Sequence, residues 1–227
     1  MDIDFWAARW REGRIGFHEG RTNAFLERHV ARLGASGRRV LVPLCGKTED
    51  LAFLAAQGHS VLGVEAVEEA ARAFFQEHGL TPQSTERGEH IRELSSGRVT
   101  ILVGDFFACT PDVAGPVNAL WDRGALVALS AADRARYVPR LRELLAPGSK
   151  GLVVNCEYDT STMDPPPHSV PESEVRRLYE GARVEEIEGG IFQTPRMREL
   201  GVTALEHCFA IELSDLRELV SCESHDL

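Results

Sequence analysis

Apolar residues follow two patterns along the chain, one short and uninterrupted and the other at helical spacing. Residues 38–44 (RRVLVPL) form a β-branched run without polar alternation, which is typical of a strand covered on both faces. Four similar runs follow, separated by helical segments. This alternation predicts a doubly wound, mostly parallel α/β sheet with helices on both faces. The predicted strands are 38–44, 59–64, 99–103, 117–121 and 151–156, and the helices between them are 48–57, 67–78 and 131–145.

The two ends of the chain add further elements to this alternating region. Residues 3–12 and 23–33 have apolar residues at helical spacing, so two helices are expected before the first strand. Residues 162–172 (TMDPPPHSVPE) are too rich in proline for a regular helix or a central strand. Two strand-like segments follow, at 182–188 and 203–213, and predict an antiparallel hairpin at the sheet edge. The sheet would then have seven strands within a single domain.

Composition and charge narrow the class of protein. The chain has 227 residues, of which 43% are hydrophobic and 26% are charged, as in ordinary globular proteins. Its net charge of −10 argues against nucleic-acid binding, which depends on clustered lysine and arginine. No apolar stretch is long enough for a membrane span, and the amino terminus lacks a signal core, so we expect a cytoplasmic protein. The five cysteines have no metal-binding spacing, and no metal site is expected.

Polar residues follow several of the predicted strands, where an open α/β sheet binds its ligands. Glu65 comes directly after an apolar strand and 19 positions after Gly46, a spacing at which an acid can accept hydrogen bonds from ribose hydroxyls. The turn at Gly46 has neither a GxGxxG nor a P-loop pattern, which disfavours a ligand with a pyrophosphate. A nucleoside ligand without phosphates fits this turn better than a dinucleotide, and S-adenosyl-L-methionine is a common ligand of that kind.

Other residues at these strand ends have two readings each. Asp105 could serve an adenine amino group or cap the following segment, and Phe106 could pack in the core or against a purine face. Arg123 could pair locally with its neighbour Asp122 or face a ligand. Three aromatic residues near the amino terminus are expected, from spacing alone, to form a packing stripe. They are Trp6, Trp10 and Phe17.

Seven sequence blocks occur in a fixed order and together span nearly the whole chain. They are FWAARW (5–10), IGFHEG (15–20), VLVPLCGKTEDLAFLAAQGHSVLGVE (40–65), FF (74–75), GDFF (104–107), LWDRGALVAL (120–129) and NCEYD (155–159). With these blocks the sequence resembles the bacterial thiopurine S-methyltransferases. The resemblance implies a Rossmann-like fold, S-adenosylmethionine as cofactor and methyl transfer to the sulfur of an aromatic or heterocyclic thiol. It also implies a monomer.

The resemblance also implies roles for individual residues. Trp10, Leu44, Glu65 and Arg123 would contact S-adenosylmethionine, with the turn through Gly46 lining its methionine side. Two further residues, Asp105 and Phe106, match positions that flank adenine. Trp6, Trp10 and Phe17 would belong to a flap over the cofactor and part of the acceptor pocket, with Trp6 and Phe17 lining that pocket. The domain would then consist of an N-terminal helical flap (1–36), a Rossmann-like core (37–213) and a polar tail (214–227).

Two arginines, Arg123 and Arg196, match positions near the acceptor in this family. We hypothesise that they stabilise an anionic acceptor, because an arginine does not lose its proton at neutral pH. His18 is the remaining candidate for a base, although a flap histidine bonded to backbone is the simpler reading. Residues 83–98, a segment that helps to shape the acceptor pocket in this family, match the family loosely.

Three alternatives remain open at this stage. A related enzyme could methylate another soft nucleophile, such as a selenium or tellurium oxyanion, a halide or a small thiol. A nicotinamide-dependent oxidoreductase would use a similar sheet, but the glycine fingerprint is missing. A nucleoside-binding protein without catalytic activity would keep the strand-end residues and lack turnover.

Overall fold

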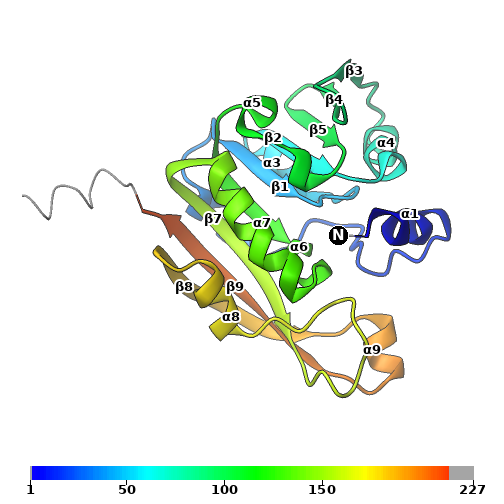
Figure 1. The fold of residues 1–227 in the computed structure, drawn as a ribbon, viewed down its shortest axis with the longest axis vertical. Coiled ribbons are helices and arrows are strands. Elements are labelled where there is room, and N and C mark those ends of the chain that lie inside the picture. The colour runs from blue at the N-terminus through cyan, green and yellow to red at the C-terminus, as the bar shows by residue number, and fades with distance from the viewer. Residues whose placement is uncertain (1, 215–227) are drawn as a thin grey trace, which may run out of the picture.

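The five apolar runs predicted as strands lie side by side and parallel at the centre of one sheet (Figure 1). The computed structural model describes residues 2–214. The strand order across the sheet is β3-β4-β5-β2-β1-β6-β7-β9-β8, so the order reverses between β1 and β6. These central strands are β1 (Arg39–Pro43), β2 (Ser60–Glu65), β5 (Val99–Val103), β6 (Val117–Arg123) and β7 (Leu145–Glu157).

Antiparallel strands extend the sheet at both edges. The predicted C-terminal hairpin is β8 (Ala182–Phe192) and β9 (Ala204–Leu213), and β9 pairs with β7. At the other edge, β3 (Gln83–Glu86) pairs with β4 (Arg92–Ser96), and β4 pairs with β5. The predicted count of seven strands is therefore wrong, because the sheet has nine strands within residues 2–214. The side chains of β3 are all exposed, so its sequence carries no apolar signal.

Helices cover both faces of this sheet, which confirms the predicted α/β class. Each face buries its own apolar cluster between the strands and the helices. The helices of one cluster are α5 (Pro111–Ala114), α6 (Ala125–Ala128), α7 (Ala131–Leu144) and α8 (Glu172–Leu178). Those of the other cluster are α2 (Ala24–His29), its 3-10 continuation η1 (Val30–Leu33), α3 (Asp50–Ala56) and α4 (Glu68–Glu77). The short element η2 (Phe106–Ala108) adds the Phe106 ring to the first cluster. Two elements lie outside these layers, α1 (Ile3–Arg11) and α9 (Pro195–Glu199).

Helix α1 stands apart from both helical layers. In the view of Figure 1 it lies between α4 and α9, at the side of the sheet. Its amino end is capped by Asp2, whose carboxylate accepts a hydrogen bond from the Phe5 amide, and none of its residues is fully buried. Few buried contacts therefore hold α1. The flap over residues 1–36 stays a prediction, and within that range α2 and η1 pack into one of the two apolar clusters.

The remaining predictions about the chain concern its end and its relation to a membrane. The predicted tail over 214–227 lies outside the described residues except for Ser214, whose hydroxyl donates to the Gly181 carbonyl at 2.7 Å. Among the described helices, none combines the length and the apolar character that crossing a bilayer requires.

Candidate active site

The carboxyl ends of the central strands open into a cavity of about 450 Å³. A cavity of this size suits a small organic ligand. Its walls come from α1 and the loop after it, the ends of β1, β2, β6 and β7, the start of β9, the proline-rich loop and α9. The structure brings eight predicted residues together here. They are Trp6, Trp10, Phe17, Leu44, Gly46, Glu65, Arg123 and Arg196.

Glu65 joins the ends of two neighbouring strands. One carboxylate oxygen accepts a hydrogen bond from the Gly46 amide at 2.7 Å, and the other accepts from the Val67 amide at 2.8 Å. Burial raises the pKa of Glu65, and these backbone hydrogen bonds oppose the shift. Each oxygen of a carboxylate has a second lone pair. Glu65 therefore fixes the turn after β1 and still has acceptor capacity toward the cavity.

The turn after β1 has a backbone conformation that brings it close to the flap. Leu44 has a φ of 48° and Gly46 a φ of 54°, both in the left-handed region. For a non-glycine residue such as Leu44 this conformation is costly and is found most often at functional sites. A Cβ on Gly46 would lie 2.9 Å from Cζ2 of Trp10. The glycine thus lets the Trp10 ring pack directly against the backbone of the turn.

The three aromatic residues of the flap pack on one another as well as lining the cavity. Phe17 stands between the two tryptophans, with ring centroids 5.6 Å from Trp6 and 5.7 Å from Trp10. Both contacts are edge-to-face, the geometry that aromatic rings prefer. The packing stripe expected from their spacing and the cavity wall implied by the family resemblance are therefore the same group of residues.

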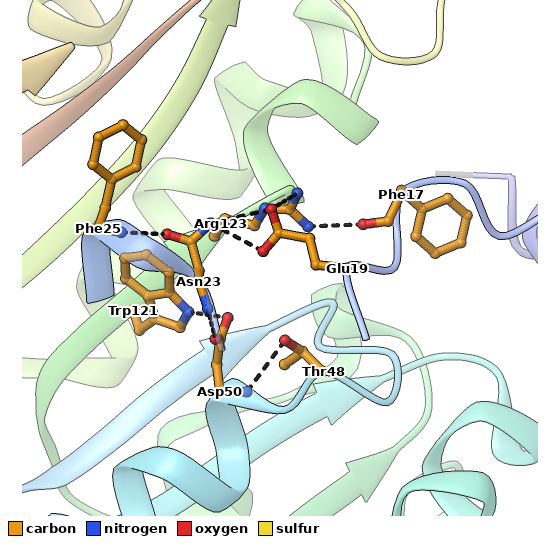
Figure 2. A network of polar contacts seen from close by, with 8 residues as sticks. All are labelled: Phe17, Glu19, Asn23, Phe25, Thr48, Asp50, Trp121 and Arg123. Atoms are coloured by element: carbon orange, nitrogen blue, oxygen red, sulfur yellow. Dashed lines mark hydrogen bonds and ion pairs between the residues drawn. The ribbon is translucent and has the colours of Figure 1, made fainter. Parts of the chain in front are cut away.

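Arg123 connects β6 to the flap (Figure 2). Its guanidinium donates to the Phe17 carbonyl at 2.8 Å and forms an ion pair with Glu19 at 3.1 Å. The local ion pair with Asp122 considered above is not formed. Asp122 points to the other face of the sheet, where it accepts a hydrogen bond from the Tyr137 hydroxyl at 2.9 Å. Adjacent residues of a strand point to opposite faces, so this separation follows from the strand itself.

A buried polar network continues from Glu19 into the core (Figure 2). The Asn23 side chain donates to Glu19 at 3.1 Å, and the Asn23 amide donates to the Asp50 carboxylate at 2.8 Å. The other oxygen of Asp50 accepts from Nε1 of Trp121, also at 2.8 Å. Burial raises the pKa of Asp50. No sequence pattern pointed to Asp50, because an acid at the start of a helix commonly has only a capping role.

The end of the cavity away from Glu65 is formed by the C-terminal half of the chain. Arg196 extends from α9, and its guanidinium lies 3.4 Å from the Pro166 carbonyl of the proline-rich loop. Phe192 and Glu206 line the same region, and no sequence pattern pointed to Glu206. We name the two ends of the cavity after the roles that the family resemblance implies. The region around Glu65, Leu44 and Gly46 is the cofactor end, and the region around Arg196, Phe192 and Glu206 is the acceptor end.

Asp105 and Phe106 do not line this cavity. The Asp105 carboxylate caps η2 by accepting from the Phe107 amide at 3.0 Å. The Phe106 ring is buried in the core, with its centroid 4.9 Å from that of Tyr137. In the structure both residues have the capping and packing roles that the sequence left open, and their contact with adenine stays a prediction.

Comparisons with known proteins agree with the sequence resemblance. The sequence profile of thiopurine S-methyltransferase (TPMT) matches residues 1–212. A thiopurine S-methyltransferase of Pseudomonas aeruginosa is 47% identical over 84% of this chain and 88% of its own length. One of Xanthobacter autotrophicus is 49% identical over 79% of this chain and 84% of its own length.

Solved structures show the same fold at much lower identity. A Burkholderia thailandensis 1,6-didemethyltoxoflavin-N1-methyltransferase, solved with S-adenosylhomocysteine, has a TM-score of 0.62 at 18% identity over 94% of this chain and 87% of its own. The magnesium protoporphyrin IX methyltransferase of Synechocystis has a TM-score of 0.60 at 13% identity, over 91% of this chain and 94% of its own. With the profile match over residues 1–212 and relatives close to half identical, this chain belongs to the thiopurine S-methyltransferase family.

Proposed function

We propose that this protein is an S-adenosylmethionine-dependent methyltransferase that transfers a methyl group to the sulfur of aromatic or heterocyclic thiols. Membership of the family supports this activity. The observation that carries the proposal is one cavity that joins a buried carboxylate, Glu65, to two arginines, Arg123 and Arg196. The proposal includes a cytoplasmic, monomeric enzyme acting on a small molecule.

The residues at the cofactor end fit a nucleoside with an amino acid attached. Glu65 would accept hydrogen bonds from ribose hydroxyls, while Leu44 and Gly46 would line the methionine part. Trp10 would cover the cofactor from the flap, since its ring already rests on Gly46. When bound, S-adenosylmethionine supplies an electrophilic methyl group on a positively charged sulfur, so the protein needs no nucleophile of its own.

The residues at the acceptor end would hold the thiolate and keep water away. Arg123 uses two of its five N–H donors for Phe17 and Glu19, which leaves donors for an anionic sulfur. Arg196 would supply a second positive charge from α9. The three aromatic rings of the flap would close the cavity over both ligands. Alignment of this kind accounts for several kcal/mol of a reaction barrier, with about 7–11 kcal/mol as the ceiling.

The test is Arg123→Ala, with binding and turnover measured separately. We expect methyl transfer to an aromatic thiol to fall at least about tenfold, because an anionic acceptor loses one charged partner. Calorimetry with S-adenosylhomocysteine reports the cofactor end in the same variant. The matched control is Arg140→Ala, which removes an arginine from the surface of α7, where it pairs with Glu143. Unchanged turnover in Arg123→Ala would contradict its role, and no binding of S-adenosylhomocysteine to the wild type would reject the whole proposal.

A further inference from the structure

Glu206 is a carboxylate at the acceptor end that the proposed roles do not use. It lies on β9, two strands along from Arg123 in the order β6-β7-β9. The register pairs Arg123 with Val154, and Cys156 with Glu206. Paired residues of neighbouring strands point to the same face, as do alternate residues along one strand. Arg123, Cys156 and Glu206 therefore share one face of the sheet at the edge where the cavity opens.

The carboxylate of Glu206 is distinguished by its lack of a partner. Among the described residues, none forms a hydrogen bond or an ion pair with it, whereas Glu19, Asp50, Glu65 and Asp122 all have such partners. Its side chain is part of the cavity wall. An acid with free lone pairs, placed where an acceptor would sit, is available to take a proton.

Each neighbouring element contributes to the charge around Glu206. Arg123 on β6 carries a positive charge and Glu19 of the flap a negative one, and the imidazole of His207 is next to Glu206 along β9. On β7 the opposing residue is the Cys156 thiol, and on β8 it is Gly190. On α9, Arg196 and Glu199 line the same cavity. Burial raises the pKa of Glu206 to about 7, with Arg123 opposing the shift.

The other cavity groups are poorly suited to accept a proton from a thiol. Arginine stays protonated in proteins, which excludes Arg123 and Arg196 as bases. Burial lowers the pKa of His18, with the charges of Lys47 and Arg123 acting in the same direction, so its imidazole is a weaker base than an ordinary histidine. Burial also raises the pKa of the Cys156 thiol to about 12, so that it remains protonated.

We propose that Glu206 is the general base that takes the proton from the acceptor thiol, a role that rests on the proposed methyl transfer. The S–H bond of the thiol breaks, and its proton goes to a carboxylate oxygen of Glu206. The acceptor sulfur forms a bond with the methyl carbon as the bond from that carbon to the sulfonium sulfur breaks, leaving a neutral thioether product and S-adenosylhomocysteine. Glu206 then returns its proton to water.

The main experiment compares Glu206→Gln with the wild type on two thiols, one alkyl and one aromatic. An alkyl thiol is mostly protonated at pH 7, and we expect its turnover to fall about a hundredfold or more without the base. A strongly acidic aromatic thiol is already ionised, so its turnover should change by only about twofold. The wild-type rate on the alkyl thiol should rise with pH through about 7, and this rise should disappear in Glu206→Gln.

Two further variants separate proton transfer from structure. Glu206→Asp keeps a carboxylate and should recover part of the alkyl-thiol rate. Glu212→Gln changes an exposed glutamate of the same strand and should leave both rates unaltered. Equal affinity of wild type and Glu206→Gln for S-adenosylhomocysteine, measured by calorimetry, would show that the cofactor end is intact.

A titration followed by carbon-13 NMR of labelled glutamate tests the group without turnover. One carboxyl signal titrating near pH 7 in the wild type and absent from Glu206→Gln supports the proposal, and titration near pH 4 would overturn it. Equal losses on both thiols in Glu206→Gln, or an unchanged pH profile, would also overturn it. If the wild type methylates no thiol at all, the proposed function fails first and this role fails with it. A wild type that is active with thiols, beside an equally active Glu206→Gln, would refute the role of Glu206 alone.

Discussion

Gly46 is the residue through which the flap contacts the cofactor end. Replacing it with alanine adds a Cβ that would lie 2.9 Å from the Trp10 ring and places a side chain at a φ of 54°. We expect affinity for S-adenosylhomocysteine to fall about tenfold, equivalent to about 1.4 kcal/mol, because Trp10 must move off the turn. Calorimetry with S-adenosylhomocysteine gives this affinity directly.

The control for this variant is another glycine with the same backbone conformation. Gly79 has a φ of 65° and open space around its Cα, and it lies outside the cavity. Gly79→Ala should lower the free energy of unfolding by about 1–2 kcal/mol, the cost of a left-handed alanine, and leave the affinity unchanged. Equal affinities of Gly46→Ala and the wild type would show that the Trp10 contact does not support cofactor binding.

Three elements are joined by the carboxylate of Asp50. It lies at the start of α3 and accepts from the Asn23 amide before α2 and from Trp121 on β6. Asp50→Ala would leave two buried N–H groups without partners, at about 1–3 kcal/mol each. We therefore expect the free energy of unfolding, measured with urea at pH 7, to fall by about 2–6 kcal/mol. Thr48→Ala removes the hydroxyl that accepts one long hydrogen bond, at 3.3 Å, from the Asp50 backbone amide, and should lower the free energy of unfolding less. Similar losses in the free energy of unfolding for Asp50→Ala and Thr48→Ala would show that the Asp50 carboxylate does not stabilise the fold through this network.

The strands that could be predicted from the sequence are those whose side chains are buried on both faces of the sheet. The strands around Val40, Val61 and Ile101 were found because each is an uninterrupted apolar run. The β3–β4 hairpin was missed because its partner strand and the turn, rather than an apolar face, define it. The start of β7 was also missed, because Pro147 and Gly148 are typical of a turn.

The same distinction applies to the site. Glu65 could be placed from its separation in sequence from Gly46. Glu65 ends β2, and Gly46 lies in the turn after β1, the neighbouring parallel strand. Asp50 and Glu206 could not, since their importance depends on contacts with segments far away in the sequence. Arg123 was predicted to lie near the ligand, whereas its hold on Phe17 and Glu19 appears only when the flap folds back over β6.

The protein has a net charge of −10 and places several acids away from water. Among residues 2–214, burial raises the pKa of four carboxyl groups, those of Asp50, Glu65, Asp122 and Glu206. Burial also lowers the pKa of three histidines, His18, His59 and His168. Through these four acids the folded state binds more protons than the unfolded state at mildly acidic pH. Through the three histidines it binds fewer protons where histidine titrates in the unfolded chain. The acids should make stability fall as pH rises above about 4, and the histidines should oppose this fall as pH rises toward about 6.5.

Asp122 isolates one contribution to this balance. Burial raises its pKa from the ordinary 3.8 to about 7. Below pH 3.8 it is protonated in both states, and between these two values only the unfolded state releases the proton, so stability decreases as pH rises. The full contribution is about 4 kcal/mol between pH 4 and pH 8. In Asp122→Asn this decrease should be absent when the free energy of unfolding is measured with urea at several pH values. The loss of hydrogen bonds in the variant lowers the free energy of unfolding by the same amount at every pH.

The slope of stability against pH is the informative quantity, because an offset shifts the whole curve equally. Asp112→Asn, at an exposed position of α5, should keep the wild-type slope between pH 4 and pH 8. Glu206→Gln should remove a second part of the same decrease, since burial gives Glu206 a pKa of about 7 as well. Because Asp122 and Glu206 lie on different strands, the double variant should show the sum of the two changes in slope. If Asp122→Asn had the wild-type slope, Asp122 would be ionised in the folded protein throughout this range, and its buried hydrogen bond from Tyr137 would be made to a carboxylate.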